Sequence, residues 1–162
     1  FHNPRIESSI DFIFREGRSS LSEYVFKTKV VKQIGFKEFP LGWFSDVLAV
    51  LEFSNFKNIF SISNAVVYIR ISDESISGSV SNLILKSKAG FQYYHYLLSK
   101  KKNRFNTIQI EILLKKISSY YLNDKRNILY FIKISILYFK NLQFMNFFVF
   151  LKAIYSKLIK SN

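Results

Sequence analysis

The sequence predicts a chain of two parts, an α/β first half followed by an all-α second half. The β-branched and aromatic runs that we interpret as strands lie before residue 73. Both prolines and all five glycines occur no later than Gly90, so the rest of the chain contains no helix breaker. We therefore expect an α/β region over residues 1–85 and an all-α helical region over residues 86–162.

Three stretches of the first half predict strands. Residues 10–14 (IDFIF) alternate roughly with a period of two, and residues 24–26 (YVF) are β-prone. Residues 58–72 (NIFSISNAVVYIRIS) form a β-branched and aromatic run long enough for two strands, and a turn-like segment follows it.

Two short helices are expected between these strands. Residues 28–34 predict one helix, which ends at Gly35. Residues 46–54 (DVLAVLEFS) have apolar positions at helical spacing and predict a helix of two to three turns. Asp46 would lie in its first turn or cap, where a negative charge is favourable.

The second half reads as helices throughout. Helical patterns cover residues 84–102, 106–122 and 127–160, and we expect two to four helices there. The longest uncharged run, Asn141 to Leu151, has eleven residues. A bilayer span needs about 20, so none is predicted.

Charge divides the chain in the same way. Residues 1–85 hold nine Lys/Arg and nine Asp/Glu, whereas residues 86–162 hold fifteen against two, which accounts for the whole net charge of +13. There is no cysteine, and His2 and His95 are the only histidines, so a Cys- or His-built metal site is not expected.

The order of motifs in residues 20–80 resembles that of a known enzyme family. A short helix leads to a Gly-Phe pair, a variable loop leads to a Ser-Asp pair opening a helix, and a strand leads to Tyr-x-Arg and Ser-x-Ser. The residues concerned are Ile34-Gly35-Phe36, Ser45-Asp46, Tyr68-Ile69-Arg70 and Ser75-Ile76-Ser77. This order is similar to the C-terminal half of the catalytic domain of inverting family 2 glycosyltransferases, which have the GT-A fold of nucleotide-diphospho-sugar transferases.

The resemblance implies a catalytic role for Asp46. Inverting transfer needs a carboxylate that takes the proton of the acceptor hydroxyl as this hydroxyl attacks the anomeric carbon. The base of the family aligns with Asp46. The alternative interpretation, from spacing alone, is an ordinary Asp at a helix N-cap.

Three more residues are candidates for substrate binding. Trp43, the only tryptophan, could stack under a sugar ring or anchor the loop. Arg70 could bind a phosphate or an acceptor carboxylate, or else pair with Asp73 or Glu74. Ser45 stands where many relatives have an acidic residue, and Ser75 and Ser77 are interpreted as turn residues.

The donor side of such an enzyme is missing from the sequence. The family binds the nucleotide-sugar through an N-terminal half that ends in an Asp-x-Asp metal motif, and neither that motif nor a Gly-rich phosphate loop occurs here. The resemblance therefore implies a C-terminal portion that binds no cofactor and is inactive alone. In the full-length enzyme it implies Mg²⁺ or Mn²⁺, a nucleotide-sugar, and a saccharide or lipid-linked acceptor.

The basic region 86–162 has three interpretations. Its lysines and aromatic residues could lie on an anionic membrane surface, could bind nucleic acid, or could form a helical bundle with a solvated Lys face. No nucleic-acid-binding motif is present, so no nucleic acid is expected. We expect a cytoplasmic protein, peripheral on the inner face of the plasma membrane if the first interpretation holds. The competing function is a non-enzymatic helical interaction or membrane-docking protein.

Overall fold

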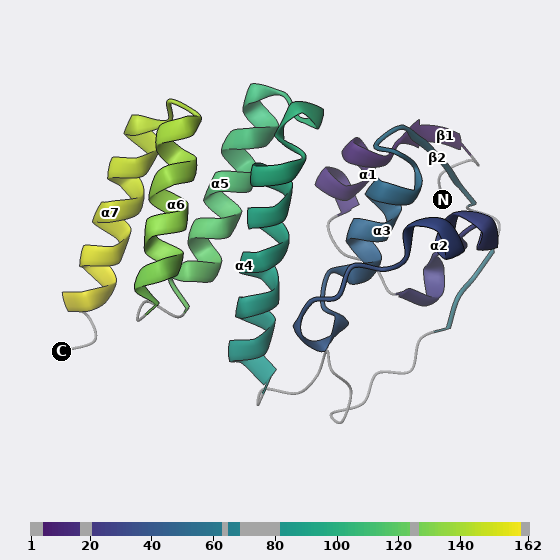
Figure 1. Ribbon diagram of the computed structural model, residues 1–162, viewed down its shortest axis with the longest axis horizontal. Helices are drawn as coiled ribbons and strands as arrows, with labels where there is room; N and C mark the ends of the chain where they lie inside the picture. Colours follow the sequence, from purple (N-terminus) through teal and green to yellow (C-terminus); the bar gives the residue numbers. More distant parts are fainter. Residues whose placement is uncertain (1–4, 17–20, 63–64, 69–81, 124–126, 160–162) are drawn as a thin grey trace. The chain divides into compact units, whose positions relative to one another are not determined.

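The computed structural model describes residues 5–16, 21–62, 65–68, 82–123 and 127–159 (Figure 1). The chain divides into two compact units, Phe1–Val80 and Ser81–Asn162. The described residues form seven α-helices and a single two-stranded antiparallel sheet, and 72% of them are helical. The expected α/β half of a GT-A domain is therefore wrong, because such a half needs a larger sheet than these two strands.

In the first unit, strand β1 (Arg5–Ser8) pairs with β2 (Asn58–Ser61). The register aligns Arg5 with Ser61 and Ser8 with Asn58. The Glu7 carboxylate on β1 joins the two strands, because its Oε1 accepts a hydrogen bond from Ser61 Oγ on β2 at 2.5 Å. Its Oε2 lies 2.6 Å from Arg15 Nη2, and this ion pair links β1 to helix α1 (Ser9–Glu16).

The strand predicted over residues 10–14 is instead part of α1. Ile10, Ile13 and Phe14 are spaced i, i+3, i+4, so the same five residues fit a helical face as well as an alternating strand. A five-residue window cannot separate the two periods, and the contact of α1 with α3 favours the helix.

Two other stretches with strand-like composition are not strands. Residues 24–26 have no regular secondary structure, and Phe26 packs on α3, with its ring centroid 5.1 Å from that of Phe53. In the predicted pair of strands, residues 58–61 form β2 and residues 65–68 are irregular, while residues 63–64 and 69–72 lie outside the described residues. β1 is four residues long, so it can pair only with the first part of that run.

Helix α3 (Ser45–Phe53) is the core of the first unit. Its residues from Val47 to Leu51 are all buried, and α1 and α2 (Thr28–Ile34) pack against it. The predicted end of α2 is confirmed, since Gly35 caps it with φ 73°, a conformation that glycine adopts without strain. Two 3₁₀ turns, η1 (Leu21–Glu23) and η2 (Pro40–Gly42), complete this unit.

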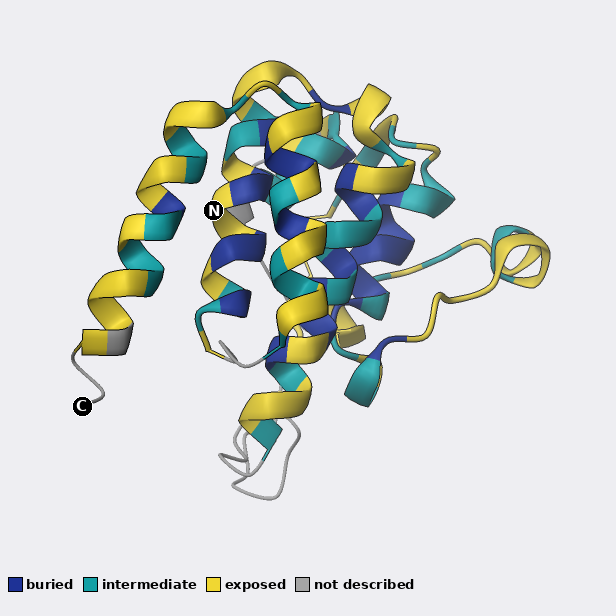
Figure 2. Ribbon diagram, turned by 60° about the vertical axis from the view of Figure 1, so that its left-hand side comes forward, coloured by how far each residue is buried: buried dark blue, intermediate teal, exposed yellow. Residues whose placement is uncertain are grey.

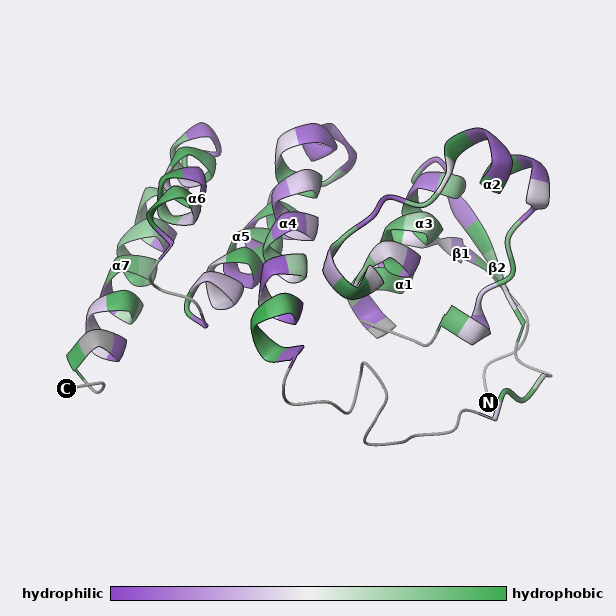
Figure 3. Ribbon diagram, turned by 60° about the horizontal axis from the view of Figure 1, so that its bottom comes forward, coloured by the Kyte–Doolittle hydropathy of each residue, from purple (hydrophilic) through white to green (hydrophobic). Residues whose placement is uncertain are grey.

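The second unit is a row of four helices, each running antiparallel to the next (Figures 1 and 3). They are α4 (Leu83–Lys100), α5 (Thr107–Tyr121), α6 (Ile128–Lys140) and α7 (Phe144–Ile159), with the 3₁₀ turn η4 (Lys102–Arg104) after α4. The predicted helical character of this half is confirmed. None of the described helices combines the length and apolar character that crossing a bilayer requires.

Aromatic and aliphatic side chains fill the interior of the four-helix row. Ala89, Leu114, Ile117 and Ile134 are fully shielded from solvent. The Phe91 and Tyr130 rings stack with their centroids 3.7 Å apart and join α4 to α6.

Candidate functional site

Asp46 is the second residue of α3 and is buried, with 7% of its surface exposed. The structure confirms the first-turn position predicted for it. The N-cap residue is Phe44, whose side chain cannot cap the helix, so Asp46 does not hold the cap position. Asp46 Oδ1 accepts a hydrogen bond from the Val47 amide at 2.9 Å, and within the described part of the chain Oδ2 accepts none.

The loop that leads into α3 has an unusual backbone. Leu41, Gly42 and Phe44 have φ values of 62°, 64° and 74°. A side-chain-bearing residue in this left-handed region costs about 1–2 kcal/mol. The Phe44 side chain is buried, and its burial supplies free energy that offsets the strain. This turn determines where Trp43 lies and how Ser45-Asp46 enters the helix.

Trp43 and Ser45 flank the turn. Trp43 is half-buried, and its ring meets the Phe44 ring edge-on with centroids 6.4 Å apart. Ser45 Oγ is shielded from solvent and has no hydrogen-bond partner among the described residues. The structure thus brings Trp43, Ser45 and Asp46 together in one turn. Arg70, Ser75 and Ser77 lie outside the described residues.

Sequence reasoning missed the part that Phe44 plays. It anchors the strained turn from the N-cap position, where Ser, Thr, Asp or Asn is the usual residue. The available signal was the Pro40-Leu41-Gly42 sequence, since Pro followed shortly by Gly indicates a tight turn.

The site offers no ligand set for a divalent cation. No three His, Cys, Asp or Glu residues lie close enough together, anywhere in the described ranges, to hold a metal ion. The resemblance places the Mg²⁺ or Mn²⁺ of a full-length enzyme on the donor half, so no chemical step on this chain is derived through a metal.

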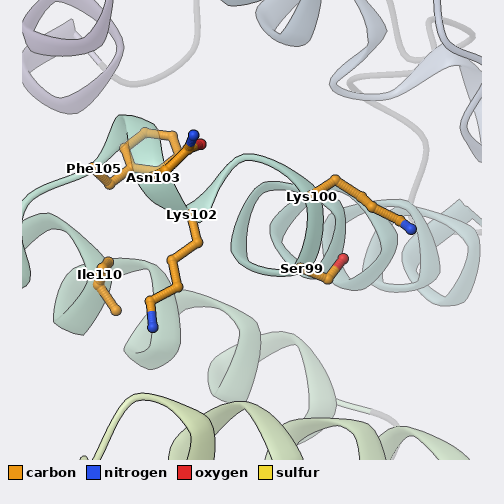
Figure 4. A pocket seen from close by; sticks show the side chains of 6 residues that line it. All are labelled: Ser99, Lys100, Lys102, Asn103, Phe105 and Ile110. Carbon is orange, nitrogen blue, oxygen red and sulfur yellow. The ribbon is translucent and has the colours of Figure 1, made fainter.

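Apart from the residues around Asp46, a hollow at the end of α4 is a further candidate site. It is an open pocket of about 450 Å³ lined by Ser99, Lys100, Lys102, Asn103, Phe105 and Ile110 (Figure 4). The Lys100 side chain points away from Lys102, so the two ammonium groups do not converge on one point. Lys102 Nζ instead donates to the Lys140 carbonyl oxygen at 3.4 Å. This arrangement does not form a binding site for a defined ligand.

Comparison with known proteins found no match to this chain among family models, curated proteins or solved structures. The assignment of function therefore depends on the residues and their geometry.

Proposed function

We propose that this chain supplies the general base of an inverting glycosyl transfer, and that Asp46 is that base. The observation that carries the proposal is the Asp46 carboxylate, buried in the first turn of α3 directly after the strained turn that holds Trp43. The reaction moves a sugar from a nucleotide-sugar to a hydroxyl of a saccharide or lipid-linked acceptor. The motif resemblance to inverting family 2 glycosyltransferases supports this choice of reaction.

The hydrogen bonding of Asp46 supports this role. Its Oδ1 accepts from the Val47 amide, so Oδ2 would be the oxygen that receives the proton of the acceptor hydroxyl. As the acceptor oxygen bonds to the anomeric carbon, its proton passes to Asp46 Oδ2. The bond from the anomeric carbon to the nucleotide diphosphate breaks with its electron pair, so the configuration inverts.

Trp43 and Ser45 would position the acceptor. The half-buried indole offers an apolar surface on which the C–H face of a sugar ring can pack. Ser45 Oγ is shielded from solvent and lacks a hydrogen-bond partner within the described chain, so it would bond to a sugar hydroxyl once the turn opens to admit the acceptor. For Arg70 the proposed role is to bind a donor phosphate or an acceptor carboxylate.

Donor binding is not assigned to these residues. The sequence has no Asp-x-Asp motif, so we propose that the 162-residue chain alone turns over no nucleotide-sugar. Because the proposed donors are cytoplasmic metabolites, the reaction would take place on the cytoplasmic side of the membrane. If the purified 162-residue chain turned over a nucleotide-sugar, the proposal that its residues do not bind the donor would be wrong.

The test of the base is a transfer assay with a panel of nucleotide-sugars on the complete product of the gene. Asp46→Asn keeps the shape and the Val47 hydrogen bond but removes the proton acceptor. We expect transfer to fall about 100-fold or more while donor binding is unchanged.

Asp11→Asn is the matched control, because Asp11 also lies in the first turn of a helix but is exposed. It should leave transfer within about twofold of wild type. Equal rates for wild type and Asp46→Asn would show that Asp46 only stabilises the start of α3.

Acceptor binding can be tested on the 162-residue chain, because Trp43 is its only tryptophan. Acceptor saccharides should change the tryptophan fluorescence in a saturable way, and Asp46→Asn should retain this signal. If no saccharide that serves as an acceptor in the transfer assay changes the emission, the proposed platform role of Trp43 is wrong.

A further inference from the structure

Helix α6 exposes an apolar stripe on the side that faces away from its neighbours. Its buried positions are Ile134, Leu137 and Tyr138, and Tyr138 contacts Ser118 on α5 and Phe147 on α7. The opposite side is solvent-exposed and is apolar along its length, at positions Ile128, Leu129, Ile132, Ile136 and Phe139.

Helix α7 exposes a second stripe of the same kind. Phe150 is its buried residue, whereas Met145, Phe148 and Val149 are exposed by 78%, 62% and 65%. Figure 2 shows exposed residues along the whole outer side of α7, and Figure 3 shows the same helix to be largely hydrophobic. The full α7 stripe is Phe144, Met145, Phe148, Val149, Tyr155 and Ile159.

The two stripes meet at the turn between α6 and α7. The rings of Phe139 and Phe144 meet across the α6–α7 turn with centroids 5.6 Å apart, and both are half-exposed. We call the two stripes together the α6–α7 outer face. An exposed apolar surface that extends over two helices marks an interaction site rather than ordinary surface.

The charges on these helices all have one sign. Lys133 and Lys140 border the stripe on α6, Lys152 lies within the stripe on α7, and all three are exposed. Lys102 adds an ammonium group beside the end of α6 through its bond to the Lys140 carbonyl oxygen. From residue 127 to residue 159 there is no acidic side chain.

We propose that the α6–α7 outer face docks on the surface of an anionic lipid bilayer. Its apolar side chains would enter the boundary between headgroups and acyl chains, and its lysines would contact anionic headgroups. The 16 residues of α7 span about 24 Å, less than the roughly 30 Å hydrocarbon core, so the helices would lie in the membrane plane.

The charge pattern favours a bilayer over a second copy of the chain. In a symmetric dimer the same lysines would face one another across the interface, and like charges placed so oppose association. An anionic bilayer provides the complementary charge and an apolar phase together. The inference is independent of Asp46, so either proposal can fail without the other.

The test is co-sedimentation of the 162-residue chain with two kinds of vesicle. One is phosphatidylcholine alone, and the other contains about 30 mol% phosphatidylglycerol, which gives a clearly negative surface. We expect binding to the anionic vesicles and at least about tenfold weaker binding to the neutral ones. The triple variant Lys133→Gln, Lys140→Gln, Lys152→Gln should lower the anionic partition coefficient on the order of 100-fold.

The apolar contribution is tested by Met145→Gln, Phe148→Gln and Val149→Gln together. These positions are exposed, so the far-UV circular dichroism and the thermal midpoint should stay close to wild type while vesicle binding falls at least about tenfold. The charge-matched control replaces three exposed lysines outside α6 and α7, namely Lys32, Lys88 and Lys116, with Gln, and it should retain most of the binding.

Several results would overturn the inference. One is that the chain does not bind anionic vesicles at low salt, and another is that it binds neutral vesicles as well as anionic ones. A third is that the control lysine variant loses as much binding as the variant of Lys133, Lys140 and Lys152. A lipid-free dimer that the apolar variant converts to a monomer would also overturn it, because the occupant of the face would then be a second copy.

Discussion

At the scale of single residues, a buried hydroxyl pair joins α5 to α6. The Ser118 and Tyr138 oxygens lie 2.9 Å apart, and both side chains are buried. Burial raises the pKa of the Tyr138 phenol although the Ser118 hydrogen bond acts in the opposite direction. The phenol therefore stays protonated and can donate throughout the physiological pH range.

Tyr138→Phe should destabilise the protein by about 1–3 kcal/mol, because Ser118 Oγ is then left buried without its partner. Ser118→Ala should have a similar effect, and the double variant should lose less than the sum of the two. Urea unfolding followed by circular dichroism measures all three values. Strictly additive losses would show that the hydrogen bond contributes no coupling energy.

The residues of the candidate site were predictable to different degrees. The first-turn position of Asp46 followed from the apolar spacing of Leu48 and Leu51 after it. The anchoring by Phe44 did not, because it depends on a positive φ that is tolerated only where the side chain is buried.

At the scale of elements, Gly90 allows α4 and α5 to approach closely. A Cβ atom placed on Gly90 would lie 2.4 Å from a ring carbon of Tyr120. The Tyr120 ring is stacked on Tyr94, with centroids 5.6 Å apart, and so has little room to move. Close contact at this glycine is one reason why these two helices pack as a pair.

Gly90→Ala should lower the stability by about 1–2 kcal/mol, since the overpacking cost exceeds the gain in helix propensity. In a Tyr120→Ala background the same substitution should become neutral or stabilising, because the clashing ring is absent. Thermal unfolding of the four proteins forms the double-mutant cycle. Destabilisation by Gly90→Ala in both backgrounds would mean that Tyr120 is not the obstacle.

Elements with a local signal were predicted well. α5 starts with a capping box in which Asn106 accepts from the Gln109 amide at 2.9 Å and the Gln109 side chain accepts from the Asn106 amide at 3.0 Å. The break between α6 and α7 has no such signal: neither Gly nor Pro is present, and Leu142 adopts φ 54°. The position at which the chain reverses direction between α6 and α7 is determined by the packing of these two helices against each other.

At the scale of the whole molecule, pH acts on the helical unit through His95. The imidazole is half-buried on α4 and stacks on Phe91 with ring centroids 6.0 Å apart. Burial lowers the pKa of His95, and the nearby ammonium groups of Lys133 and Lys100 lower it further. As the pH falls below about 6.5, the unfolded chain therefore binds a proton at this residue before the folded chain does.

The free energy of unfolding should therefore decrease as the pH falls below about 6.5, and the decrease should level off once the folded protein also binds the proton. Its slope cannot exceed about 1.4 kcal/mol per pH unit for one group. In His95→Gln the urea concentration at the unfolding midpoint should change less between pH 5 and pH 7.5 than it does in wild type. His2→Gln, which removes the only other histidine, is the matched control, and an equally reduced change in both variants would exclude His95 as the cause.

The sequence by itself determined the properties that depend on local composition and spacing. These are the helical second half, the Gly35 end of α2, the first-turn position of Asp46 and the concentration of positive charge after residue 85. Helix periodicity, glycine freedom and charge are read from neighbouring residues, so no distant contact is needed to predict them.

The tertiary structure alone decided the features that depend on distant partners. β1 and β2 pair across about 50 residues of chain, and the described residues form no further strand, so the predicted α/β half is absent. Whether an apolar residue is buried also depends on its neighbours in space. The stripes on α6 and α7 look like core in the sequence, and they are exposed because no described element covers them.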